Sequence, residues 1–117
     1  MASCCFVLAL LKVTAELESL SANSAYRFAA TKAYEAIVNQ RVEVLREERF
    51  QGRQTFREFM MRRYDPAMRT VRSTETRLTT LVDRARRAGE LLRTKVDVER
   101  SAQNQALLES MDKRADL

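Results

Sequence analysis

Strong helix breakers are nearly absent from this chain. Its 117 residues include two glycines and one proline, whereas a compact domain of this length normally uses such residues at several turns. So few breakers leave room for about one reversal of direction, which favours a few long helices over any sheet. We therefore predict a single all-α domain over residues 1–117: a long, coiled-coil-like antiparallel helical hairpin with a short helix at its tip.

The first long helix is predicted over residues 6–48, where neither Gly nor Pro occurs. Apolar residues recur there at the heptad spacing of coiled coils; they include Leu10, Val13, Leu17 and Leu20. The pattern weakens over residues 21–24, which predicts a phase slip or a mild bend.

The chain is predicted to reverse within residues 49–65. Gly52 follows the first helix as a stop signal. Thr55 and Glu58 form a capping-box pattern, which predicts that a short tip helix begins here.

A second start signal follows at Asp65 and Pro66. Asp caps free backbone amides, and Pro at the first helical position loses no hydrogen bond. A second long helix is therefore predicted over residues 66–115.

The predicted seam follows from the place of the reversal. If the chain turns near Glu58, facing positions should add up to about 116, so that large side chains meet small ones. Phe28 would then lie against Ala88, with Tyr34 near Val82 and Ala85. The predicted seam residues are Phe28, Tyr34, Ala85, Ala88 and Leu92.

Positive charge gathers around the predicted reversal. Residues 41–87 contain thirteen arginines and seven acidic residues, while the whole chain carries a net charge of +5. Such a cluster could attract the phosphates of lipid headgroups or nucleic acid. A solvated helix face with intrahelical pairs gives the same pattern, and Glu43 with Arg46 and Glu58 with Arg62 have suitable spacing. We favour the solvated face and expect no nucleic-acid partner, because no recognised binding motif accompanies the arginines.

Aromatic and Met side chains crowd the same stretch. They either pack the short helix against the long ones, which is the simpler interpretation, or form an adaptable patch for a protein partner. The candidate interaction residues at the tip are Phe50, Phe56, Phe59, Met60, Arg62, Arg63 and Tyr64.

Catalytic chemistry has little basis in this sequence. It has no His and no Gly-rich phosphate loop, and its only cysteines are the neighbours Cys4 and Cys5. We therefore expect no enzyme activity, no cofactor and no metal site. Free thiols indicate a reducing compartment, and the apolar stretch that follows them is shorter than the ~20 residues of a membrane span.

From about Ala25 onward, over roughly three quarters of the chain, five runs of residues are distinctive, and the last two are the most specific because helix periodicity does not demand their polar residues. They are residues 26–30 (YRFAA), 45–49 (LREER), 59–70 (FMMRRYDPAMRT), 91–98 (LLRTKVDV) and 103–115 (QNQALLESMDKRA). These runs resemble the C-terminal half of an uncharacterised bacterial membrane-anchored protein family, catalogued as domain of unknown function 3422.

The resemblance implies a membrane-proximal helical stalk that follows a larger N-terminal domain and precedes apolar spans. Neither part is expected within this chain, so a membrane would be reached only through parts missing from it. The implied location is the cytoplasm or the cytoplasmic face of the bacterial inner membrane. The layout also resembles that of bacterial magnesium and cobalt channels, by architecture alone. A divalent-cation-transporter-like assembly is therefore a weaker alternative, and no catalytic residues carry over from the family.

We expect a structural or interaction module that self-associates, with a dimer favoured, because one helical seam cannot cover every apolar residue. The alternative is a binding module whose basic tip contacts anionic lipid or nucleic acid. Salt separates the two, since apolar association tolerates salt and phosphate contacts weaken with it.

Overall fold

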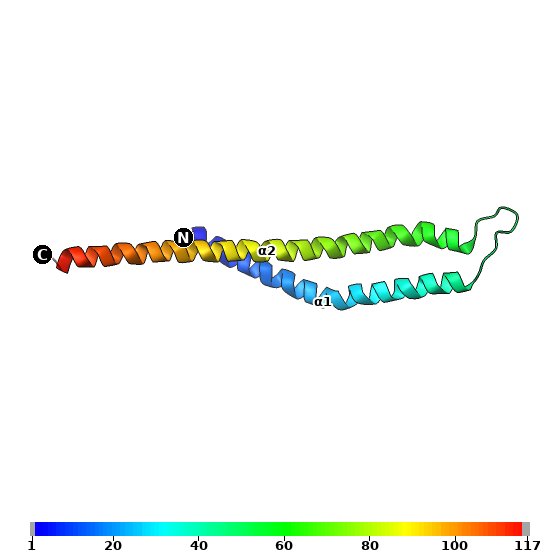
Figure 1. Cartoon of the computed structure of the whole chain (residues 1–117), viewed down its shortest axis with the longest axis horizontal. Helices are drawn as coiled ribbons and strands as arrows, with labels where there is room; N and C mark the ends of the chain where they lie inside the picture. The colour runs from blue at the N-terminus through cyan, green and yellow to red at the C-terminus, as the bar shows by residue number, and fades with distance from the viewer. Residues whose placement is uncertain (1, 116–117) are drawn as a thin grey trace. The chain divides into compact units, whose positions relative to one another are not determined.

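The computed structural model describes residues 2–115. It contains two helices, α1 (Ala2–Val44) and α2 (Phe56–Ala115), joined by a loop over residues 45–55 (Figure 1). No strand occurs within the described residues. The prediction of an all-α fold with two long helices in contact is therefore confirmed.

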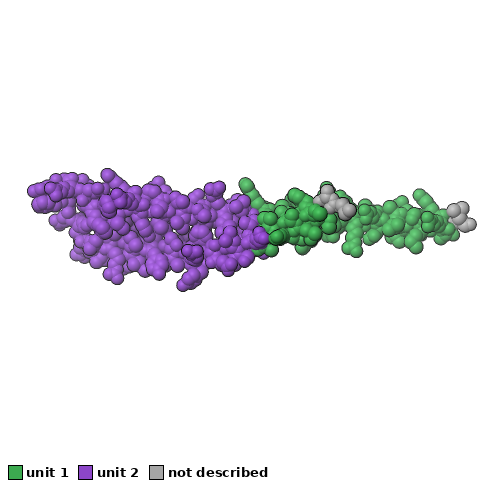
Figure 2. All heavy atoms as spheres, turned by 180° about the vertical axis from the view of Figure 1, so that it is seen from behind, with its two compact units in different colours: residues 1–15, 83–117 green, residues 16–82 purple. Residues whose placement is uncertain are grey.

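The chain forms two compact units, which Figure 2 shows in different colours. Unit 2 comprises Glu16–Val82 and includes the loop. Unit 1 combines Met1–Ala15 with Asp83–Leu117. The predicted single domain thus consists of two packing units, and each helix contributes residues to both.

Helix α1 ends at Val44, earlier than the predicted residue 48. The N–H of Leu45 donates to the carbonyl of Arg41, and the N–H of Arg46 donates to that of Glu43. Arg46 adopts a left-handed backbone conformation, with φ of 45°. A left-handed residue directly after the last turn ends a helix even without glycine, so the stop lies before Gly52.

The predicted short tip helix is not a separate element. Helix α2 begins at Phe56 and continues through Pro66 to Ala115, so the start signal expected at Asp65 and Pro66 is wrong. Pro66 lacks the N–H that would bond the carbonyl of Arg62, but one missing bond does not end a helix that is held by packing. Residues on both sides of the proline provide this packing, since Tyr64 is half-buried and Met68 is buried.

Contact between the helices follows one stripe on each of them, which we call the seam. Its residues recur at alternating intervals of three and four, the spacing of a coiled-coil seam. On α1 they are Val7, Leu10, Thr14, Leu17, Ser21, Ser24, Phe28, Thr31, Glu35, Val38 and Val42. On α2 they are Met61, Tyr64, Met68, Val71, Glu75, Leu78, Val82, Ala85, Gly89 and Leu92.

The apolar heptad predicted at the start of α1 coincides with the seam at only half of its positions. Leu10 and Leu17 are half-buried, whereas Val13 and Leu20 are exposed. The seam takes the polar neighbour Thr14 in place of Val13. The register of the two helices places Thr14 in the seam, although the neighbouring Val13 is more apolar.

The predicted register is also wrong. Ion pairs across the hairpin join Lys32 with Glu75, Glu35 with Arg72, and Arg49 with Glu58, and each pair of positions adds up to 107 instead of about 116. The cause is the place of the reversal, because the turn consists of the loop over residues 45–55 and contains no extra helix.

Little of the hairpin is buried. Among the described residues the buried side chains are Val42, Met68 and Val82, and none of them is polar or charged. A two-helix seam shields each side chain from one direction only, so the remaining apolar residues stay in contact with water.

Candidate functional site

The loop end of unit 2 is held together by side chains that satisfy the first amides of α2. The Thr55 hydroxyl accepts from the N–H of Glu58 at 3.2 Å, and the Glu47 carboxylate accepts from the N–H of Arg57 at 2.8 Å. The predicted capping box is therefore half present. The Glu58 carboxylate does not complete it, because it forms an ion pair with Arg49.

Three phenylalanines protrude at this end of the hairpin. Phe50 lies in the loop with 71% of its surface exposed, and Phe56 and Phe59 are exposed in the first turn of α2. The guanidinium of Arg63 lies over the Phe59 ring, 4.7 Å from its centroid, at the distance of a cation–π contact.

The other predicted tip residues divide between the surface and the packed face of α2. Arg62 and Arg63 are exposed, whereas Met60 and Tyr64 are half-buried. Tyr64 belongs to the seam. Packing therefore accounts for Met60 and Tyr64, while the remaining tip residues lie at the surface.

Arginines surround the exposed rings. Residues 45–63 contain six arginines and three glutamates. Five of these arginines are exposed and take part in no ion pair of the described residues; one is Arg63, which lies over the Phe59 ring, and the other four are Arg46, Arg53, Arg57 and Arg62. The tip surface, as we define it, consists of these four arginines with Phe50, Phe56 and Phe59.

A shallow hollow lies between the loop and the start of α2. Its lining includes the carboxylates Glu47 and Glu48 beside Phe50, Arg53 and Phe56. Two carboxylates and one guanidinium therefore line the hollow.

The intrahelical pairs expected from the sequence are absent from the ion pairs of the described residues. Glu43 and Arg46 form none, and Glu58 is paired with Arg49 instead of Arg62. The positive charge of the tip arginines is therefore neutralised less than it would be if these residues formed ion pairs within the helix.

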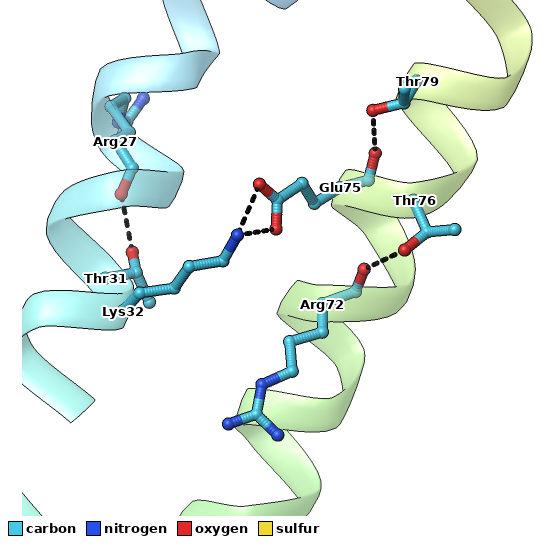
Figure 3. Close-up of polar contacts among 7 residues, drawn as sticks. All are labelled: Arg27, Thr31, Lys32, Arg72, Glu75, Thr76 and Thr79. Carbon is cyan, nitrogen blue, oxygen red and sulfur yellow. Dashed lines mark hydrogen bonds and ion pairs between the residues drawn. The ribbon is translucent and has the colours of Figure 1, made fainter. Parts of the chain in front are cut away.

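A polar layer crosses the seam in the middle of unit 2 (Figure 3). The Lys32 ammonium lies 2.8 Å from a carboxylate oxygen of Glu75, and Arg72 pairs with Glu35. The side chain of Glu35 is only 14% exposed. Sequence reasoning missed this layer and predicted Tyr34 in the seam, although the heptad spacing of Glu35 from Phe28 could have indicated it.

The predicted seam residues separate in the structure. Phe28 is half-buried and lines a small hollow together with Leu78 and Thr79, where Ala88 had been expected. Ala85, Ala88 and Leu92 are also half-buried and belong to unit 1. Tyr34 is 67% exposed, because the register and helix phase bring Glu35 into the seam instead.

Unit 1 contains a helical segment with no covering partner. Every residue of α2 over positions 93–115 is exposed, although the segment remains helical. We call this segment the tail. Its exposed large apolar residues are Val96, Val98, Leu107, Leu108 and Met111.

The start of α1, also in unit 1, is apolar on both of its sides. Val7 and Leu10 face the seam, while further apolar side chains remain exposed. Those exposed side chains are Phe6, Leu8, Leu11 and Val13. A helix that is apolar all round is normally covered on more than one side.

Residues 2–115 contain no cluster of metal ligands and no membrane-spanning helix. No group of three or more His, Cys, Asp or Glu residues in this part is placed to hold a metal ion. No helix in the described part combines the length and hydropathy needed to cross a bilayer. Cys4 and Cys5 are exposed and free.

Comparison with known protein families gives a match over nearly the whole chain. Residues 5–117 match the family described as "Protein of unknown function (DUF3422)". The match begins nearer the N-terminus than Ala25, where the resemblance in the sequence begins. No curated protein and no solved structure matches the chain.

Proposed function

Because the chain belongs to the DUF3422 family, whose function is unknown, we propose its role from its structure: a structural interaction module that self-associates through unit 1. It serves as the helical stalk of a longer membrane-anchored protein. The stalk role is supported by the long two-helix architecture and by the resemblance in layout, and the anchor itself would lie in segments outside this chain.

The tail is the observation that carries the proposal. Isolated helices are only marginally stable in water, because nucleation is costly. Most helical stability in proteins comes from packing of an apolar face. The tail has exposed apolar residues on its C-terminal turns, Leu107, Leu108 and Met111, at spacings of three and four. Such spacing places them on one side of the helix. A partner that covers this side would stabilise the tail.

A second copy of the chain is the simplest partner. The exposed side of α1 in unit 1, with Phe6, Leu8 and Leu11, carries Lys12 as its single charge over residues 4–13. It therefore presents mainly apolar surface to a partner helix. Two copies bring two tails and two such faces together, and symmetric pairing is the commonest form of oligomer.

Sedimentation equilibrium tests this proposal. We expect the average molecular mass in solution to rise from that of a monomer toward that of a dimer as the protein concentration increases. The dimer should persist at high salt. The triple substitution Leu107→Ser, Leu108→Ser and Met111→Ser should leave a monomer at concentrations where the unchanged chain dimerises.

The matched control places serines on exposed apolar residues of unit 2: Tyr26→Ser, Tyr34→Ser and Ile37→Ser. This control should dimerise like the unchanged chain. A monomer at every concentration would refute self-association. Equal loss of the dimer in the control would show that the tail is not the contact.

A further inference from the structure

We propose that the tip surface of unit 2 docks onto the headgroup region of an anionic lipid bilayer. The proposal does not depend on self-association through unit 1, because it concerns a different unit and different residues. It rests on three observations at the loop end of the hairpin: exposed rings, arginines outside the ion pairs of the described residues, and a hollow whose lining has two glutamates and one arginine.

The protruding rings provide the apolar contact. Phe50, Phe56 and Phe59 are exposed where the chain turns. Aromatic side chains are favoured at the boundary between lipid and water. Phe50 lies in a loop whose backbone amides are not all satisfied by a helix, so it can enter the headgroup region but not the hydrocarbon core.

The arginines provide the charge complementarity. Arg46, Arg53, Arg57 and Arg62 lie at the same end of unit 2 as the rings and are free of ion pairs with described residues. The glutamates of this region are partly engaged within the protein, since Glu58 pairs with Arg49 and Glu47 caps the N-terminus of α2. Guanidinium groups bind lipid phosphates with matching geometry, and an anionic surface attracts clustered basic residues.

The shape of the tip favours a flat partner over a nucleic-acid strand. Proteins that bind single strands use a positive groove that follows the phosphate backbone. The hollow at the tip is instead lined by two glutamates, Glu47 and Glu48, and one arginine, Arg53, so it is not a positive groove. A bilayer surface can contact the exposed rings and arginines without following a groove.

Vesicle sedimentation tests the docking. The full chain should bind vesicles of phosphatidylglycerol and phosphatidylcholine at low salt, bind pure phosphatidylcholine vesicles much more weakly, and be released by high salt. The triple substitution Arg46→Gln, Arg53→Gln and Arg62→Gln should weaken binding roughly a hundredfold, since each basic residue near such a surface contributes about a fivefold factor.

A matched control removes the same charge elsewhere in unit 2. Arg27, Arg69 and Arg77 are exposed and form no ion pair with described residues. Their substitution with Gln should change vesicle binding by less than the tip substitution does. If the two triple variants lose affinity equally, net charge and not the tip surface causes the binding, and the proposal is wrong.

Tryptophan fluorescence locates the contact. The chain has no Trp, so Phe50→Trp introduces a single reporter at the tip, and Tyr26→Trp introduces one at an exposed site on α1. Anionic vesicles should shift the emission of the Phe50→Trp chain to shorter wavelength and leave that of the Tyr26→Trp chain unchanged. An unshifted emission from the tip reporter with bound vesicles would refute docking through Phe50.

Two further outcomes count against the proposal. The serine variant of the tail should bind anionic vesicles like the unchanged chain. If this variant fails to bind, the contact with the vesicles lies in unit 1 and not at the tip. Single-stranded polyuridylate provides the remaining comparison. Binding to polyuridylate that depends on the tip arginines, without binding to anionic vesicles, would make nucleic acid the partner and overturn the lipid assignment.

Discussion

Lys32 of α1 and Glu75 of α2 form an ion pair across the seam, with 2.8 Å between Nζ and the carboxylate oxygen. Glu75 and its counterpart Glu35 occupy seam positions that coiled coils usually fill with apolar side chains. Each carboxylate meets a cation from the opposite helix in one register only. We therefore infer that this layer opposes slippage of the hairpin, at some cost in stability.

Replacing both seam carboxylates with Leu should make the hairpin more stable. Leucine in place of Glu35 and Glu75 extends the apolar seam, and Lys32 and Arg72 are more than half exposed, so their charges can turn to water. We expect the free energy of unfolding to rise by roughly 1 to 2 kcal/mol, measured by denaturant titration of the circular dichroism signal.

The single substitution Arg72→Ala should have the opposite effect, because it leaves the poorly exposed Glu35 without its cation. We expect a loss of about 1 kcal/mol. Arg69→Ala, at an exposed position outside the ion pairs, is the control and should change stability little. A double Leu variant that unfolds earlier than the unchanged chain would contradict this account of the layer.

The register predicts which side chains are energetically coupled. Phe28→Ala should lower the free energy of unfolding by roughly 2 kcal/mol, less than the 3 to 5 kcal/mol typical of a fully buried ring, because Phe28 is half-buried. Combined with Leu78→Ala, it should show an interaction energy of at least ~0.5 kcal/mol in a double-mutant cycle, since both residues line one hollow.

Ala88→Leu provides the comparison for that cycle. In the register expected from the sequence, the added bulk would press on Phe28 and couple strongly to its removal. In the register of the structure, the effects of Ala88→Leu and Phe28→Ala should be additive. Strong coupling of Phe28 with Ala88, and none with Leu78, would support the register expected from the sequence, which the ion pairs contradict.

Substitution of Pro66 distinguishes a continuous α2 from a helix that starts at the proline. Within a helix Pro costs up to ~3 kcal/mol relative to Ala, whereas at the first helical position it costs almost nothing. Because α2 continues through Pro66, Pro66→Ala should raise the free energy of unfolding by roughly 1 to 3 kcal/mol and increase helical circular dichroism.

Ser73→Ala, at an exposed position inside α2, is the matched helix-propensity control and should stabilise by less than ~0.7 kcal/mol. A neutral effect of Pro66→Ala would indicate that the helix begins anew at the proline in solution.

The helical character of this chain is determined by its sequence. Gly and Pro are too sparse for a fold of strands and multiple turns. The cap at Thr55 is encoded locally, because the Thr55 hydroxyl accepts a hydrogen bond from the amide of Glu58. The gathering of exposed phenylalanines and arginines near Phe50 could likewise be predicted, because residues close in the sequence remain close around a turn.

Tertiary packing determined the rest. The end of α1 at Val44 and the passage of α2 through Pro66 go against the local signals at Gly52 and Pro66, which packing between the helices outweighs. These two boundaries place the reversal and so the register, which brings Glu35 and Glu75 into the seam and leaves Tyr34 exposed. Each helix alone allows several registers, and only contacts made across both helices at once select one of them.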